Sequence, residues 1–121
     1  MEKTYIICPV RNVTDEIQVL IDKHAQDCRA RGEIVHNPKY DAPQEDETGH
    51  AICVCHLEAM KSATRVDVIW DVESKGSHFD LGMAFALGKK VRLVAMLHPD
   101  TPGKSYVKVM EEMGKSLVTL E

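Results

Sequence analysis

The apolar residues of this chain fall into short runs. Polar segments with proline or glycine lie between these runs. Runs of strand length cover residues 4–8, 33–37, 66–72, 91–97 and 116–120. Between them, helical spacing or a cap residue predicts helices from Asn12 or Thr14 to about residue 31, over residues 48–63 and 79–87, and from Ser105 to Met113. Residues 39–47 are polar and contain a proline, so they predict a loop.

The repeated order of strand and helix along the chain predicts an α/β fold. We expect a single domain over residues 1–121, with five parallel strands in one sheet and helices on both faces. This arrangement is the doubly wound, three-layer sandwich of flavodoxin-like and Rossmann-like domains. Because ligands of such sheets bind beyond the carboxyl ends of the strands, residues 9–12, 71–80 and 98–105 are expected on one rim.

The overall composition argues against several classes of protein. A chain of 121 residues with 44% hydrophobic content is long enough to bury one real core. Its net charge of -4 gives no reason to expect nucleic acid or an anionic membrane as a partner. No apolar run approaches the ~20 residues of a membrane span, and the first residues lack a signal-peptide pattern. The four cysteines are therefore expected to be reduced thiols in a cytoplasmic protein.

The segment 74–94 carries the best candidate for chemistry. It is predicted to be a small-residue loop with Ser74, Gly76 and Ser77, then a largely apolar and buried helix over residues 79–87, then a strand. Asp80 lies in the first turn of that helix. Ser77 and Asp80 also fit a capping box. The two interpretations are compatible, because a helix N-terminus would keep the Asp80 carboxylate ionised and nucleophilic.

Two nucleotide-binding motifs fit the sequence poorly. No Gly-x-Gly-x-x-Gly follows the first predicted strand, which argues against a dinucleotide site. Gly103, Lys104 and Ser105 resemble the end of a phosphate loop, but His98 occupies the place of its first glycine. A simple phosphate contact at the start of the last helix remains open.

A zinc site and a receiver domain are also disfavoured. His50, Cys53, Cys55 and His56 lie close together in the sequence. On one helix, however, position 55 points away from the face that positions 50 and 53 share, and no second ligand pair with zinc spacing follows. A receiver domain needs an acidic pair after the first strand, where this chain has Cys8. We therefore expect no metal.

Three further charged residues are expected on the carboxyl rim. Asp71 and Glu73 end the third predicted strand, and Arg11 follows the first. Arg11 could meet an anionic substrate, or it could pair with one of the two acids and only hold the rim together. Asp71 and Glu73 could belong to a binding site, or they could be ordinary solvent-exposed residues of a loop.

The pattern Ser-x-Gly-x-x-Phe-Asp-Leu-Gly-x-Ala-x-Ala-Leu-Gly-Lys-x-Val over residues 74–91 resembles the signature of the nucleoside 2-deoxyribosyltransferase-like family. That family includes deoxynucleoside 5'-monophosphate N-glycosidases. The resemblance runs from Tyr5 to the segment near Ser105 and is strongest over residues 74–91. It implies cleavage or transfer of the N-glycosidic bond of a nucleoside or its 5'-monophosphate, through a covalent glycosyl-carboxylate intermediate and without a cofactor.

The resemblance also implies roles for particular residues. Asp80 stands at the position of the nucleophile, and Tyr5 stands where a tyrosine of the first strand orients it. Arg11 and Ser74 match residues that hold the phosphate in the monophosphate glycosidases. Ser105 loosely matches a serine that sometimes reaches the site of a neighbouring subunit. A homodimer or a larger homo-oligomer is therefore expected.

Two positions depart from the family pattern. Asp80 stands where members carry glutamate, which is one methylene longer. His56 stands where many members carry an aspartate that binds the sugar hydroxyl, a role that Asp71 could take over. These departures favour an alternative function, a catalytically inactive nucleotide-binding module of the same fold.

Overall fold

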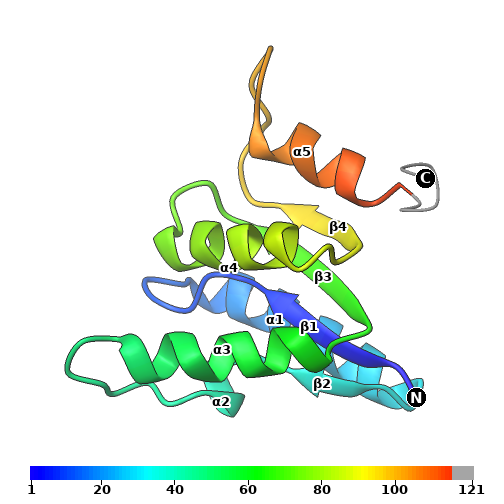
Figure 1. Ribbon diagram of the computed structural model, residues 1–121. Helices are drawn as coiled ribbons and strands as arrows, with labels where there is room; N and C mark the ends of the chain where they lie inside the picture. The colour runs from blue at the N-terminus through cyan, green and yellow to red at the C-terminus, as the bar shows by residue number, and fades with distance from the viewer. Residues whose placement is uncertain (116–121) are drawn as a thin grey trace.

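A parallel sheet lies between two layers of helices in the computed structural model, which describes residues 1–115 (Figure 1). Its strands are β1 (Lys3–Ile7), β2 (Ile34–His36), β3 (Arg65–Trp70) and β4 (Val91–Met96). The helices are α1 (Asp15–Ala30), α2 (Pro38–Asp41), α3 (His50–Ser62), α4 (Lys75–Ala86) and α5 (Tyr106–Met113).

The strands follow the order β2-β1-β3-β4, and every pairing is parallel. The predicted α/β fold with a parallel sheet is therefore confirmed. The prediction of five strands is wrong for the described residues, whose sheet has four strands. The predicted strand at 116–120 lies outside the described residues. The chain runs to opposite sides of β1 to form β2 and β3, which opens a crevice at the carboxyl ends of β1 and β3.

Two apolar cores lie on opposite faces of the sheet, because successive side chains of a strand point to opposite faces. Tyr5 of β1 packs with Met60 of α3 and Leu81 of α4 in one core, to which α5 also contributes. Ile6, the next residue, packs with Ile21 of α1 in the other core. Figure 1 shows α3 and α4 side by side across the sheet from α1. Both faces of β1 and β3 are thereby covered.

A buried acid, Asp67, lies on the sheet face that α1 covers. It accepts hydrogen bonds from Arg92 at 2.8 Å and from Arg65 at 3.1 Å, and it lies 2.8 Å from Nε2 of His24. Burial alone would raise the pKa of Asp67. The hydrogen bonds from Arg92 and His24, with the charges of Arg65 and Arg92, hold it below its ordinary value. The network ties α1 to β3 and β4, since a buried charge needs its partners.

The start of α4 differs from the prediction. The helix begins at Lys75, four residues before the predicted start at Phe79. Ser74 caps it, because its Oγ accepts a hydrogen bond from the backbone N–H of Ser77. The predicted capping box from Ser77 to Asp80 is therefore wrong. Asp80 lies in the second turn of α4, not the first.

The predicted burial of α4 against the sheet is confirmed for one face of the helix. Its inner face is buried through Ser77, Asp80, Leu81 and Ala84. On its outer face, Phe79 and Phe85 are 54% and 63% exposed. The apolar residues of α4 therefore divide between a buried face and an exposed face.

The remaining boundaries lie close to those predicted, with one exception. Residues 39–47, predicted to be a loop, overlap the short helix α2, which Asn37 caps and which has Pro38 at its first position. Thr14 is the cap of α1, and Ser105 caps α5 as predicted. No helix in the part of the chain that the structure describes is long and apolar enough to cross a membrane.

Candidate active site

A cavity of about 580 Å³ opens in the crevice beyond the carboxyl ends of β1 and β3. Its walls come from the segment after β1, from the start of α3, and from the β3–α4 connection with the first turns of α4. This is the place where a doubly wound sheet binds its ligand.

The cavity brings together most of the residues that the sequence singled out. Seven of them line it: Arg11, His56, Asp71, Ser74, Gly76, Ser77 and Asp80. Tyr5 lies directly beneath, fully buried, and reaches the cavity through its bond to Asp80. Ser105 lines a different cavity on the same rim.

Asp80 is the buried acid of the cavity, with 5% of its surface exposed. Its Oδ2 accepts a hydrogen bond of 2.8 Å from the hydroxyl of Tyr5. Its Oδ1 lies 3.4 Å from Nδ1 of His56. Burial raises the pKa of Tyr5, and the neighbouring Asp80 raises it further. Tyr5 therefore stays protonated and acts as a permanent donor to the carboxylate.

The N-terminus of α4 forms a polar wall of the cavity. The Oγ of Ser74 donates to the Oγ of Ser77 at 2.9 Å and accepts from the Ser77 backbone N–H at 3.2 Å. Gly76 lies between them, and a Cβ atom added there would meet nothing within 4 Å. The fold therefore does not need a glycine at position 76. A helix start of this kind is suited to an anion.

Two cations line the cavity, Arg11 and Lys75. Within residues 1–115 neither forms an ion pair. The ion pair of Arg11 with Asp71 or Glu73, which the sequence left open, is not formed between these described residues. Instead Nε2 of His98 lies 3.3 Å from Asp71 and 3.9 Å from Glu73. Lys75 was not predicted as a site residue, although its place directly after Ser74, the cap of α4, could have indicated it.

His36 and two cysteines are further residues that the sequence analysis did not assign to the site. His36 of β2 stacks on the ring of Tyr5, with ring centroids 4.9 Å apart. Cys8 and Cys53 line the cavity. Burial and the nearby Asp80 raise the pKa of Cys8 to about 12, so it stays a thiol. No local motif marks His36, because its contact with Tyr5 depends on the pairing of β1 with β2.

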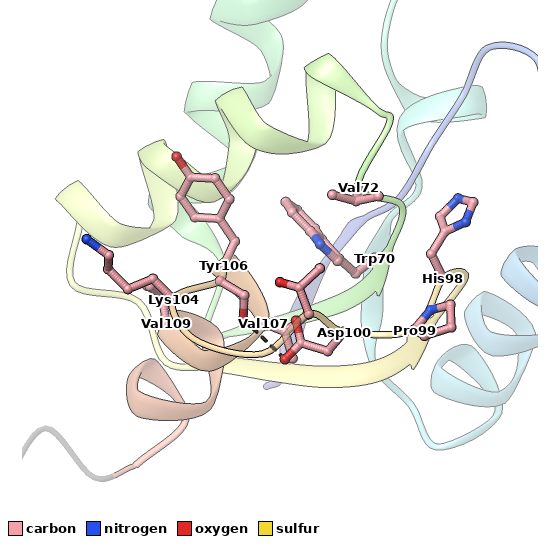
Figure 2. Close-up of a pocket in the computed structure, with 11 residues that line it drawn as sticks. Trp70, Val72, His98, Pro99, Asp100, Lys104, Tyr106, Val107 and Val109 are labelled. Atoms are coloured by element: carbon pink, nitrogen blue, oxygen red, sulfur yellow. Dashed lines mark hydrogen bonds between the residues drawn. The ribbon is translucent and has the colours of Figure 1, made fainter.

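A second cavity, of about 480 Å³, lies beside the first, between the end of β3 and the start of α5 (Figure 2). Trp70 and Tyr106 lie on its walls, with ring centroids 6.3 Å apart. Ser105 is occupied there as the cap of α5, where it accepts from the N–H of Lys108 and donates to Asp100. Within one chain, therefore, Ser105 does not join the Asp80 cavity.

Among the described residues, two groups of side chains lie close enough to share a metal ion. One is His24, Cys28 and Asp67, where guanidinium groups already occupy Asp67. The other is the exposed group of Asp71, Glu73 and His98. Neither includes Asp80, so the arrangement around Asp80 offers carboxylate chemistry with a phenol and an imidazole as neighbours.

Comparison with known proteins places this geometry in context. No family model matches the chain, and no curated protein matches it by sequence. The 2-deoxyribosyltransferase of Bacillus psychrosaccharolyticus has the same fold, with a TM-score of 0.68 and 21% identity over 98% of this chain and 95% of that one. The CMP N-glycosidase of Clostridium botulinum has a TM-score of 0.64 and 15% identity, over 93% and 82%.

This chain has the fold of those two enzymes. A conserved protein of Enterococcus faecalis V583 also shares it, with a TM-score of 0.61 and 16% identity over 93% of this chain and 72% of that one. The two enzymes are of the kinds named by the sequence resemblance, a deoxyribosyltransferase and a nucleotide N-glycosidase. That resemblance is confirmed at the level of the fold.

Proposed function

We propose that this chain is a member of the nucleoside 2-deoxyribosyltransferase-like family and cleaves or exchanges the N-glycosidic bond of a (deoxy)nucleoside or its 5'-monophosphate. The observation that carries the proposal is the hydrogen bond between Tyr5 and Asp80 in the crevice at the carboxyl ends of β1 and β3. The names of the two enzymes that share the fold agree with it.

In the proposed reaction an oxygen of Asp80 attacks the anomeric carbon of the sugar. The carbon–nitrogen bond breaks, and the base leaves with the bonding electrons and takes up a proton. The glycosyl ester that results is hydrolysed by water, or a second base attacks it, and the Asp80 carboxylate is released. Tyr5 holds one carboxylate oxygen throughout, and the scheme uses neither a metal nor an organic cofactor.

A 5'-monophosphate fits the proposed site better than a free nucleoside. Arg11 and Lys75 supply positive charge that no acid of the described chain neutralises, and both line the Asp80 cavity. The α4 N-terminus, with Ser74, Gly76 and Ser77, adds donors for an anion. Asp71, on the same cavity, is the proposed partner of a sugar hydroxyl.

A second candidate is a nucleotide-binding module without activity. Asp80 favours it, because this residue is 5% exposed and both of its carboxylate oxygens already have neighbours. A chromatographic screen for free base, run on a panel of nucleosides and 5'-monophosphates, separates the two candidates. Base release by the wild-type protein and none by Asp80→Asn supports the enzyme. Tight binding without release from any substrate supports the module.

Two properties of the whole protein belong to this proposal. We propose a homodimer or larger homo-oligomer, in which Ser105 at the second cavity serves the site of a neighbouring subunit. We also propose a cytoplasmic location, with which the four free cysteines agree.

A further inference from the structure

The carboxylate of Asp80 is held at both of its oxygens, by two rings from different parts of the fold. Tyr5 of β1 reaches Oδ2 at 2.8 Å, and His56 of α3 faces Oδ1 at 3.4 Å. Both the carboxylate and the imidazole are largely withdrawn from solvent, with 7% and 14% of their side-chain surfaces exposed. Water therefore competes little for either oxygen.

The surroundings of His56 determine which of its nitrogens carries the proton. Its Nδ1 faces the carboxylate oxygen, which can only accept a hydrogen bond. Its Nε2 is buried and has no hydrogen-bond partner among the described residues. A second N–H at Nε2 would be left unpaired, so the neutral ring with its proton on Nδ1 suits this place best.

His36 completes the support of the imidazole. Its ring meets that of His56 edge to face, with centroids 5.7 Å apart, and stacks on Tyr5. Burial lowers the pKa of His36, which keeps it uncharged. Three rings from β1, β2 and α3 thus pack on one another behind the Asp80 carboxylate.

We propose that His56 is a positioning residue for Asp80: its Nδ1–H holds the second carboxylate oxygen, and with Tyr5 it sets the orientation from which Asp80 attacks. The role acts through Asp80, so it differs from direct contact of His56 with the sugar. It rests on the proposed function, in which Asp80 is the nucleophile.

The kinetic test compares three variants of His56 in the full chain. An asparagine places an amide N–H where Nδ1 lies, a glutamine places its amide near Nε2, and a leucine offers no donor. We expect His56→Leu to lower kcat for base release on the order of 10²-fold, with little change in KM. The kcat of His56→Asn should be at least tenfold higher than that of His56→Leu, whereas His56→Gln should show no such recovery. His50→Leu is the matched control, because His50 is exposed at the start of the same helix.

Circular dichroism shows whether each variant is folded. A wild-type kcat in a folded His56→Leu protein overturns the proposal, and so does equal activity of the asparagine and glutamine variants. A loss confined to KM would mean that His56 contacts the substrate instead.

A second test is independent of turnover. Nitrogen-15 NMR of the ligand-free protein should find the His56 proton on Nδ1, and Asp80→Asn should shift that resonance, while His50 stays unchanged. A proton on Nε2, or no response to Asp80→Asn, overturns the proposal. If the wild-type protein releases no base from any substrate, the proposed function fails, and the NMR result still decides whether His56 holds Asp80.

Discussion

The hydroxyl of Tyr5 donates a 2.8 Å hydrogen bond to Oδ2 of Asp80, across 75 positions of the sequence. Tyr5 is fully buried on the central strand β1, and Asp80 lies in the second turn of α4, which packs over that strand. The sheet therefore fixes the donor, and the helix fixes the acceptor. Because burial raises the pKa of Tyr5, its hydroxyl keeps its proton at neutral and moderately basic pH.

Tyr5→Phe should lower kcat for base release by about 10²-fold, because the Asp80 carboxylate loses a fixed donor while the ring still fills the core. Steady-state kinetics on the best substrate of the panel checks this. Tyr40→Phe is a suitable control, since Tyr40 is 60% exposed on α2. An unchanged kcat in Tyr5→Phe would remove the orienting role.

Asp80→Asn should abolish base release and leave the protein folded and able to bind its ligand. The amide keeps the size of the side chain but is not a nucleophile. Chromatography measures the release, and calorimetric titration measures the binding. Turnover at the wild-type rate in this variant would contradict the assignment of Asp80. In the companion variant Asp80→Glu, a rise in activity would mean that this chain is a weakened member of the proposed family.

Arg11→Ala tests the phosphate site. The wild-type protein should bind a 5'-monophosphate at least tenfold more tightly than the matching nucleoside, a difference of ~1.4 kcal/mol. Arg11→Ala should erase most of that gap in calorimetric titrations, because its charge is not neutralised by an acid of the described chain. Lys104→Ala is the control, since Lys104 lines the second cavity. Equal affinities of the wild-type protein for both ligands would contradict a phosphate site at Arg11. So would an affinity gap that Lys104→Ala reduces and Arg11→Ala does not.

The partly buried His36 should make the protein less stable in weak acid. Its pKa in the folded state lies below the ordinary 6.5, so the unfolded chain binds the proton first as the pH falls. The free energy of unfolding should therefore decrease from pH 7 toward pH 5. His36→Phe keeps a ring against Tyr5 and should flatten that decrease, which urea denaturation at several pH values measures. Parallel curves for the two proteins would contradict this role.

The outer face of α4 suggests where subunits meet. Phe79 and Phe85 are more than half exposed there. Tyr106 of α5, which lines the second cavity, is 56% exposed. We expect at least a dimer at micromolar concentration, and Phe85→Ser should weaken it. Light scattering measures the mass of both proteins. A monomeric wild-type protein would also remove the proposed role of Ser105 in a neighbouring site.

Local signals in the sequence account for the elements and for the candidate nucleophile Asp80, whereas Tyr5 was named by the family resemblance. The order of strands and helices follows from short apolar runs and caps, because each depends on residues a few positions apart. Asp80 stood out as a lone acid in an apolar run, and Arg11, Asp71 and Ser74 followed from the rule that ligands bind at the carboxyl ends of strands.

Where two local signals were equally good, the sequence alone misplaced the element. Ser74 and Ser77 can each cap a helix, and the choice of Ser77 put the start of α4 four residues too late. A local sequence pattern does not show which residues the first turn of α4 packs against. Only the structure showed that the polar wall of the Asp80 cavity is the first turn of a helix and that Lys75 belongs to it.

By itself the sequence determined the α/β order and the candidate nucleophile Asp80, and the family resemblance named Tyr5 as its partner. Only the tertiary structure decided that His56 faces Asp80, that His36 stacks on Tyr5, and that Ser105 lies in another cavity. The physical reason is that strand pairing and helix packing bring these side chains together across tens of residues. The spacing of residues along the chain carries no information about such contacts until the sheet order β2-β1-β3-β4 is known.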